Sequence, residues 1–139
     1  MIYKTLNADE TVTLAASLAK KYGPPHTFCL KGELGAGKTA FTRGLAQGYG
    51  YNGRVSSPTF TIMNIYECDS LEIHHYDLYR INDEEELYSI GFDPQAKNAI
   101  TVVEWFDDFA HLFSPKNTTV ITISRLDGND DHRQIEVIE

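Results

Sequence analysis

The sequence has 139 residues, of which 42% are hydrophobic, and its formal net charge is -8 at pH 7. A chain of this size and composition is expected to form one domain, residues 1–139, with its own core. Its twelve Lys and Arg residues are scattered, which excludes a large nucleic-acid surface, because contacts to phosphates need clustered basic side chains. The two cysteines have no paired spacing, as is typical of a protein from a reducing cytoplasm. The sequence also has no signal-peptide pattern and no run of about 18 apolar residues, so we predict a cytoplasmic protein without membrane contact.

The first two predicted elements are a helix and a buried strand. Asn7 and Glu10 are spaced as a capping box, and an apolar stripe runs from Leu14 to Tyr22, so a helix is predicted over residues 7–22. A glycine and two prolines follow and end it. The apolar run at residues 27–30 then predicts a short buried strand.

Directly after this strand, residues 32–39 match the pattern G-x-x-x-x-G-K-[ST], a loop whose backbone N–H groups bind nucleotide phosphates. With ordinary residue usage, a chance match in a chain this short has odds of roughly one in 200. A helix predicted over residues 39–49 completes the order of strand, loop and helix that the motif requires. We therefore predict that the chain binds ATP or GTP with Mg²⁺, and the lack of an N-K-x-D motif favours ATP.

The residues of this loop have separate predicted roles. Its glycines let the backbone adopt conformations closed to other residues, so that N–H groups converge on one anion at the positive end of a helix. The Lys38 ammonium would neutralise β and γ oxygens, and the Thr39 hydroxyl would ligate Mg²⁺. A plain turn between strand and helix is the alternative, but such a turn does not require Lys followed by Thr. The loop residues predicted to contact the nucleotide are Gly32, Glu33, Leu34, Gly35, Ala36, Gly37, Lys38 and Thr39.

A hairpin is predicted next, from a β-rich stretch over residues 60–66 and a return strand over residues 71–76. Thr59 and Thr61 are candidates for a nucleotide-sensing switch, because a hydroxyl after a Ser-Pro turn can reach Mg²⁺ or the γ-phosphate. Ordinary β-propensity is the alternative explanation for both. His74 and His75 would point to opposite faces of one strand, so we interpret them as packing or surface residues rather than as metal ligands.

Two acidic residues stand at the ends of predicted strands. Asp77 ends the aromatic run of the hairpin, and Glu104 follows the apolar run at residues 99–103, the best buried strand of the chain. Enzymes with a phosphate loop usually need an acid at the end of a neighbouring strand to hold Mg²⁺, so both are catalytic candidates. Glu104 is the stronger candidate. The alternatives are a turn cap for Asp77 and a solvated acid for Glu104.

The remaining elements complete the predicted fold. A short acidic helix is predicted over residues 83–90, capped by Asn82 and closed by Gly91. The tail is predicted to form two strands, residues 119–124 and 134–138. Hairpin and crossover connections in one chain predict an α/β fold with a mixed parallel and antiparallel central sheet. Its phosphate site is expected at the carboxyl ends of the parallel strands.

These segments, in this order and spacing, resemble the TsaE (YjeE) family over about residues 5–106. The resemblance implies a P-loop NTPase-like three-layer fold and a bacterial ATPase needed to make threonylcarbamoyladenosine beside the anticodon of tRNA. It also implies two protein partners, TsaD, which transfers the threonylcarbamoyl group, and TsaB, the paralogous partner of TsaD. The acidic net charge in turn predicts that tRNA is held mainly through that complex. The segments that carry the resemblance are residues 32–39, 57–61, 75–80, 85–87 with Gly91, and 103–105.

The resemblance also assigns roles to single residues. Lys38 and Thr39 match the P-loop lysine and the magnesium threonine, and Glu104 matches the magnesium glutamate. Asp77 matches the second functional acid, and Thr59 and Thr61 match the two switch threonines. Thr11 falls near a family position on the adenine side.

Two other functions stay open from the sequence. A small-molecule or nucleotide kinase would share the loop, although the five arginines are not clustered as they usually are around a transferred phosphate. A nonenzymatic switch would use its ATP state only to gate assembly. For the ATPase we expect slow hydrolysis by the chain alone and faster hydrolysis in the complex. None of Arg43, Arg54 and Arg80 is placed as a finger arginine, which can contribute about 10³-fold or more when supplied in trans.

Overall fold

The computed structural model of the chain describes residues 1–33, 35–58 and 61–139. Within these ranges a seven-stranded sheet has the order β1-β7-β6-β2-β5-β4-β3. The mixed α/β sheet predicted from the sequence is thereby confirmed. The strands are β1 (Ile2–Thr5), β2 (His26–Lys31), β3 (Met63–Glu67), β4 (Glu72–Asp77), β5 (Ala99–Glu104), β6 (Thr118–Arg125) and β7 (Arg133–Ile138).

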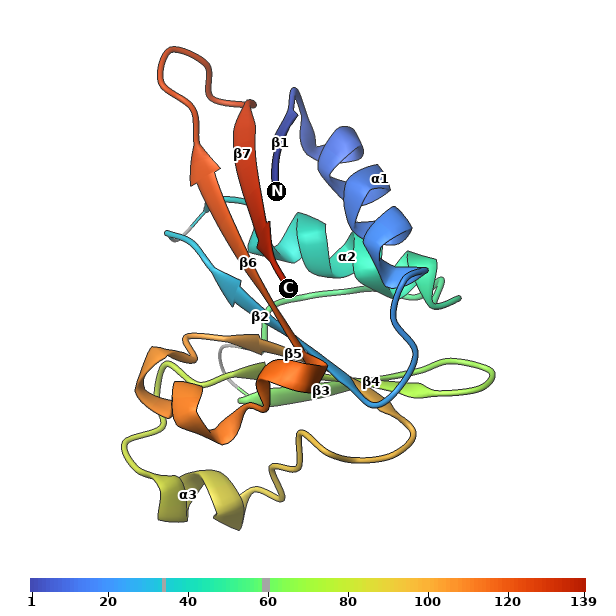
Figure 1. Cartoon of the computed structure of the whole chain (residues 1–139), viewed down its shortest axis with the longest axis vertical. Helices are drawn as coiled ribbons and strands as arrows, with labels where there is room; N and C mark the ends of the chain where they lie inside the picture. The colour runs from blue at the N-terminus through green and yellow to red at the C-terminus, as the bar shows by residue number, and fades with distance from the viewer. Residues whose placement is uncertain (34, 59–60) are drawn as a thin grey trace.

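The helices lie on both faces of this sheet (Figure 1). One face is covered by α1 (Ala8–Ala19) and α2 (Lys38–Gly48), and the opposite face by α3 (Glu84–Ser89) and two 3₁₀ helices, η1 (Asp107–Leu112) and η2 (Pro115–Asn117). Each face has its own buried apolar cluster, one under α1 and α2 and one under α3 and η1. The molecule therefore has three layers, with the sheet in the middle.

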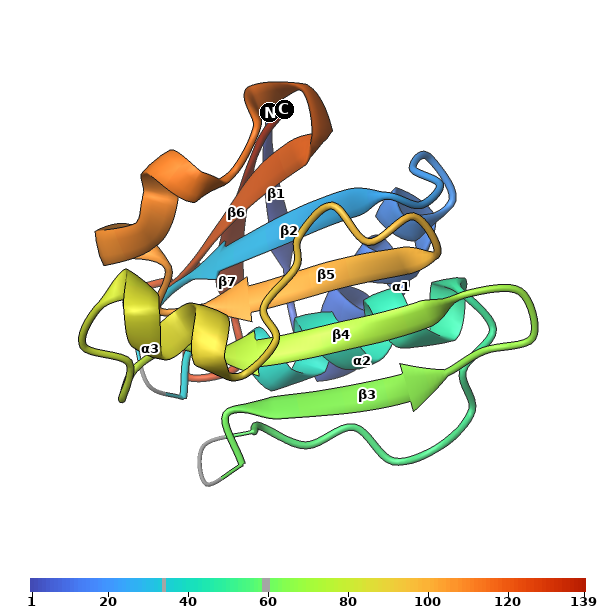
Figure 2. The same ribbon diagram turned by 90° about the horizontal axis from the view of Figure 1, so that it is seen from below.

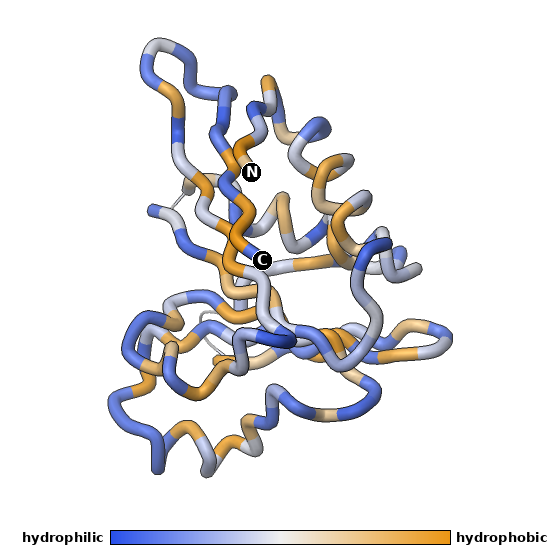
Figure 3. Tube along the Cα trace, viewed as in Figure 1, coloured by the Kyte–Doolittle hydropathy of each residue, from blue (hydrophilic) through white to orange (hydrophobic). Residues whose placement is uncertain are grey.

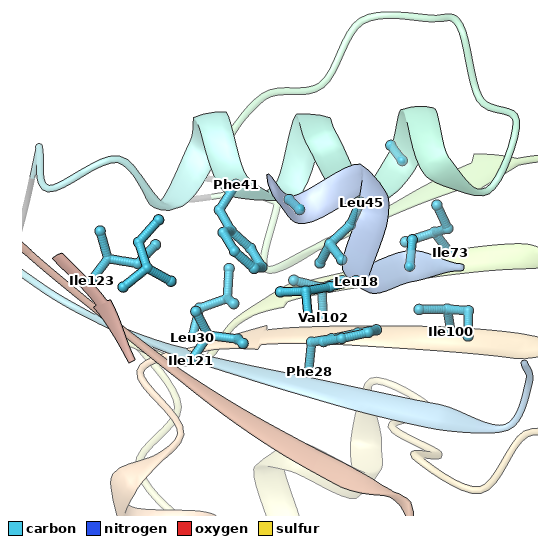
Figure 4. Packing of buried hydrophobic residues seen from close by; sticks show 14 of the residues in the cluster. Leu18, Phe28, Leu30, Phe41, Leu45, Ile73, Ile100, Val102, Ile121 and Ile123 are labelled. Carbon is cyan, nitrogen blue, oxygen red and sulfur yellow. The ribbon is translucent and has the colours of Figure 1, made fainter. Parts of the chain in front are cut away.

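The central strands are apolar because both of their faces are buried. Phe28 and Leu30 of β2 belong to the cluster under α1 and α2, whereas Cys29 between them belongs to the cluster on the other face. Figure 4 shows Phe41 and Leu45 of α2 above Phe28, Leu30 and residues of the neighbouring strands. Burying one such side chain stabilises the fold by about 1.5–3 kcal/mol. This packing fixes the position of α2 on this face of the sheet.

The two helices of the first layer also approach each other closely. A Cβ at Gly44 of α2 would lie 2.3 Å from the backbone oxygen of Val12 and 2.7 Å from the Cβ of Ala15, both on α1. Only glycine fits this contact without moving a helix. The start of α2, where the loop of residues 32–39 ends, is thereby fixed against α1.

Four neighbouring strands run in the same direction and bring their carboxyl ends to one edge of the sheet. The pairs β6 with β2, β2 with β5, and β5 with β4 are parallel, while β3, β7 and β1 pair antiparallel with their neighbours. In Figure 2 the arrowheads of β2, β5 and β4 point one way and that of β3 points the other way. We call this edge the carboxyl edge and the opposite one the amino edge.

The structure corrects several predicted boundaries. Helix α1 ends at Ala19 rather than at residue 22, and Asn7 accepts the Glu10 N–H as predicted. Helix α3 is capped by Asp83, not by Asn82, because the Asp83 carboxylate accepts the Glu86 N–H at 2.8 Å. Strand β1 and the two 3₁₀ helices were not predicted, since four residues at an edge and helices of one or two turns carry little periodicity.

The hairpin between β6 and β7 carries polar residues at its tip. Figure 3 shows hydrophilic colour at the tip of the hairpin between β6 and β7, where Asp127, Asp130 and Asp131 are exposed.

Across the described parts of the chain, no helix has the length and apolar character that crossing a membrane would require.

Candidate functional site

The predicted phosphate loop and the two predicted acids meet at the carboxyl edge. The loop of residues 32–39 leaves the end of β2, Glu104 is the last residue of β5, and Asp77 is the last residue of β4. Glu104 pairs in register with Leu30 on one side and with Asp77 on the other. Residues far apart in the sequence thus become neighbours because three parallel strands end together.

The end of the loop, just before α2, has two glycines with a left-handed backbone. Gly35 and Gly37 have φ values of 78° and 113°, in the region that favours glycine. Gly37 is the N-cap of α2 and has no side chain, so the first N–H groups of this helix receive no side-chain cap. These N–H groups and the positive end of the helix dipole can receive an anion.

Lys38 points from the first turn of α2 to the end of β5. Its Nζ lies 3.8 Å from Oε1 of Glu104, and the two residues are 7% and 3% exposed. The same ammonium lies 4.5 Å from the centroid of the Trp105 ring. The backbone of Trp105 is in the left-handed region, with a φ of 58°. A buried ion pair is costly to desolvate, so it adds little stability by itself and is more informative as a sign of function.

The second oxygen of Glu104 is held by His75, a residue interpreted from the sequence as packing or surface. His75 is completely buried, and its Nε2 lies 2.7 Å from Oε2 of Glu104. Its Nδ1 lies 3.0 Å from the hydroxyl of Tyr66, whose pKa is raised by burial, so the phenol stays protonated at neutral pH. The surface interpretation is wrong for His75, because alternation tells only that two neighbouring residues face opposite sides of the sheet.

Asp77 makes the contact of a strand-end cap and also lines the cavity of the candidate site. One carboxylate oxygen accepts the N–H of Tyr79 at 3.0 Å, which is the contact of a cap at the end of a strand. The same residue also lines the cavity that Lys38 and Glu104 line. Capping and function are therefore compatible at this position.

This cavity, which we call the loop cavity, has a volume of about 590 Å³. It brings a cation, two carboxylates and three hydroxyl-bearing side chains around the start of α2, a set that can bind an anion and a divalent metal together. Its lining residues are Gly35, Gly37, Lys38, Thr39, Ser57, Asp77, Tyr79, Glu104 and Trp105.

A second cavity of about 690 Å³ lies between the loop and the end of β6. Lys38 and Trp105 line both cavities, so the second cavity adjoins the first at these two side chains. Gly32, Glu33 and Ala36 line only this second space.

Other predicted site residues lie elsewhere. Thr11 is buried on α1, with its hydroxyl 2.8 Å from that of Thr5, and it is not among the described residues that line the two cavities. Thr61 is exposed and its hydroxyl donates to the Asn64 side chain at 3.2 Å. Leu34 and Thr59 lie outside the described residues, so their predicted contacts stay predictions.

Two arginines of the C-terminal hairpin contact the loop and were missed by the sequence reasoning. Arg125 donates from Nη2 to the carbonyl oxygen of Gly35 at 3.2 Å, and Arg133 donates from Nε to that of Ala36 at 2.7 Å. Both come from the ends of strands that the sequence predicted without a role. No local motif marks them, because the contacts span 90 and 97 residues of chain.

Oxygen atoms that could hold a magnesium ion are supplied by Thr39, Glu104 and Asp77 around the loop cavity. In residues 1–33, 35–58 and 61–139 no group of three or more His, Cys, Asp or Glu side chains could hold a metal ion. This donor set fits Mg²⁺, which is usually bound by one or two carboxylates together with substrate phosphates and water rather than by a protein cage.

The chain has clear relatives. The sequence profile of one family, described as threonylcarbamoyl adenosine biosynthesis protein TsaE, matches residues 5–135. The tRNA threonylcarbamoyladenosine biosynthesis protein TsaE of Bacillus subtilis (strain 168) is 39% identical over 137 residues, which cover 96% of this chain and 82% of that protein. The protein of the same name from Rickettsia conorii is 38% identical over 127 residues, 90% of this chain and 72% of the relative. The crystal structure of Bacillus subtilis YdiB matches with a TM-score of 0.75 and 32% identity, covering 97% of this chain and 82% of that one.

Proposed function

This chain belongs to the TsaE family of threonylcarbamoyl adenosine biosynthesis proteins, and from that premise we propose that it binds ATP with Mg²⁺ and hydrolyses it. One observation carries the proposal: a lysine from a glycine loop and an acid from the adjacent parallel strand meet 3.8 Å apart beside one cavity. A phosphate loop followed by its helix, next to a strand that ends in an acid, is the arrangement that P-loop NTPases use.

Residues 32–39 are proposed to be the P-loop. The left-handed backbone at Gly35 and Gly37 supports this assignment, because it turns successive N–H groups toward one anion. Lys38 would leave Glu104 and turn its ammonium to the phosphates, where charge accumulates as the bond breaks. The loop cavity can hold a polyphosphate beside both residues.

The metal role is proposed for Thr39 and Glu104, with Asp77 as the second functional acid. When bound, Mg²⁺ would supply positive charge next to the β and γ oxygens. Glu104 is well placed to orient such an ion because one of its oxygens is held by His75 while the other faces Lys38. Asp77, one strand further along, would organise the water or the proposed switch threonines.

We propose that the chain acts in tRNA modification together with TsaD and TsaB, as a cytoplasmic component that meets tRNA only through them. The charge of -8 supports a partner that supplies the basic groups. Arg125 and Arg133 donate to loop carbonyls, which makes them supports of the loop rather than finger arginines. Hydrolysis is therefore expected to be slow in the isolated chain and to accelerate when a partner provides an arginine in trans.

Steady-state phosphate release tests this proposal. We expect slow release by the chain alone and an increase on the order of 10³-fold with TsaD and TsaB, measured with and without tRNA. The Lys38→Ala variant in the same complex is the control for contaminating ATPases. Fast release by the chain alone that partners leave unchanged would contradict the role in trans, and no release under any condition would contradict the ATPase.

A kinase remains the second candidate because of one observation, the second cavity that also touches Lys38. An acceptor substrate would have to sit next to the phosphates, and this space adjoins them. ATP turnover without any added acceptor separates the two functions. A kinase would form little ADP until an acceptor is supplied, and it would then transfer the γ-phosphoryl group to that acceptor instead of releasing phosphate.

A further inference from the structure

A connected set of buried side chains lies behind Glu104. His75 on β4 contacts Glu104 at 2.7 Å and Tyr66 at 3.0 Å, and the Tyr66 hydroxyl also lies 3.1 Å from the carbonyl oxygen of Ser56. Ser56 precedes Ser57, which lines the loop cavity. The set therefore joins the 56–58 segment to the acid at the end of β5 through two side chains.

The donors and acceptors in this set define its hydrogen bonds. A carboxylate only accepts, so Nε2 of His75 carries the proton that it shares with Glu104. In the neutral imidazole Nδ1 is then an acceptor, and the Tyr66 hydroxyl has one proton for two acceptors, Nδ1 and the Ser56 carbonyl. Tyr66 can donate to only one of them at a time.

Glu104 has a long side chain, and its two oxygens are treated differently. Oε2 is fixed by His75, whereas Oε1 lies 3.8 Å from the ammonium of Lys38 beside the loop cavity. Fixing one oxygen restricts the rotamers that Glu104 can adopt, so the other oxygen stays aimed at the cavity even when Lys38 moves away. Without His75, the carboxylate could turn toward Lys38 with both oxygens.

We infer that His75 is a positioning residue that orients Glu104 for the metal, and that Tyr66 links this orientation to the 56–58 segment. The inference rests on the proposed function for its metal, but the hydrogen bonds themselves belong to this chain alone. Partners of this kind typically change metal affinity or activity by about 10- to 100-fold when they are removed.

The main test compares the Mg²⁺ dependence of ATP hydrolysis in two variants. In His75→Leu, which cannot donate, we expect the Mg²⁺ concentration for half-maximal turnover to rise about 10- to 100-fold. The ATP affinity measured in EDTA by calorimetry should stay within about twofold, because the hydrogen bonds of His75 among the described residues go to Glu104 and Tyr66. His75→Gln keeps an N–H donor near the same place and should recover most of the loss. The inference is overturned if folded His75→Leu needs no more Mg²⁺ than the wild type.

The matched control is His26→Gln. His26 is also buried and its Nε2 lies 2.9 Å from the Thr119 hydroxyl, but it sits at the amino edge, where β2 begins. Its replacement should leave the Mg²⁺ requirement unchanged. An equal rise in both variants would show a general effect of replacing a buried histidine and would overturn the specific role of His75.

Two further measurements decide the matter if His75→Leu does not fold. Tyr66→Phe removes a single hydroxyl and should raise the Mg²⁺ requirement severalfold, and an unchanged requirement overturns the link to the 56–58 segment. Imidazole ¹⁵N NMR of the wild type should show His75 with its proton on Nε2 and a shifted signal in Glu104→Gln. A proton on Nδ1 alone would overturn the His75 inference, whereas wild-type protein that binds no ATP would refute only the proposed function.

Discussion

The two edges of the sheet each hold a buried histidine, and the comparison separates structural from functional burial. At the amino edge His26 bonds to the Thr119 hydroxyl and stacks on Tyr22 with ring centroids 4.1 Å apart. At the carboxyl edge His75 bonds to Glu104, which itself lies beside Lys38. Both histidines are satisfied, so burial and hydrogen bonding alone do not identify a site.

The difference lies in the partners and in the strand ends. At the amino edge the histidine is hydrogen-bonded to a neutral group, an arrangement that buries a polar side chain at little cost in desolvation free energy. The carboxyl edge keeps an acid and an ammonium out of water, at a cost that apolar residues would avoid. Such an arrangement is expected where a ligand is bound. Four predictions test this comparison, beginning with the largest effect.

Removing an acid from the carboxyl edge should have the greatest effect. Glu104→Ala and Asp77→Ala are each expected to lower ATP turnover on the order of 10²-fold or more, because we propose that these acids act at the transferred phosphate. Steady-state phosphate release measures this, with thermal melting to check the fold. Glu67→Ala is the control, since Glu67 is an exposed acid that also ends a strand, but at the amino edge. Wild-type turnover in both site variants would reduce the two acids to structural caps.

Changing the loop should lower ATP affinity by a smaller factor. Lys38→Ala and Thr39→Ala are each expected to weaken ATP binding at least about 10-fold in the presence of Mg²⁺, because a hydrogen bond to a charged group contributes about 1.5–3 kcal/mol. Calorimetry gives the affinities, and Lys20→Ala, an exposed lysine after α1, serves as the control. Unchanged affinity in both variants would place the nucleotide away from residues 32–39.

A change at the amino edge should instead affect stability. Thr119→Val replaces the partner of His26 by a methyl group of similar shape and should lower the free energy of unfolding by about 1 kcal/mol, since a buried ring nitrogen loses its hydrogen-bond partner. Urea denaturation measures this loss, and ATP affinity is expected to remain as in the wild type. Weaker ATP binding at unchanged stability would show that the two edges are not functionally distinct.

The smallest effect is the pH dependence of stability. Burial lowers the pKa of His26 below its ordinary value of 6.5, with Glu139 opposing this shift. As the pH falls through 6.5 the unfolded chain takes up a proton before the folded one, so stability decreases toward acid and levels off below the folded pKa. The slope of unfolding free energy against pH near 6 should be smaller in His26→Gln. An identical slope in the variant would assign the acid sensitivity to other groups.

The sequence predicts the parts of the site that a local pattern encodes. Lys38 and Thr39 follow from the loop motif, and Glu104 follows from its place after the most apolar run. The structure places Lys38 and Glu104 in contact. The hairpin and both tail strands are likewise present close to their predicted bounds, because alternation and turn residues are local signals.

What the sequence does not predict depends on pairing between distant segments. The contact of His75 with Glu104 requires that β4 and β5 be parallel and in register, which alternation within one strand cannot specify. Arg125 and Arg133 reach the loop only because β6 lies next to β2 and β7 next to β6. The tail carries little motif signal, and its contribution to the site comes from the order of strands in the sheet.

The contact between Lys38 and Trp105 gives the protein an optical reporter of its own site. Trp105 is the single tryptophan of the chain, 40% exposed, and the Lys38 ammonium lies 4.5 Å from its ring centroid. An indole is sensitive to charge in its surroundings, so moving this ammonium to a phosphate should change the intensity and wavelength of the intrinsic fluorescence. Binding of ATP at the loop, as proposed, should therefore be visible in real time and without a label in the isolated chain.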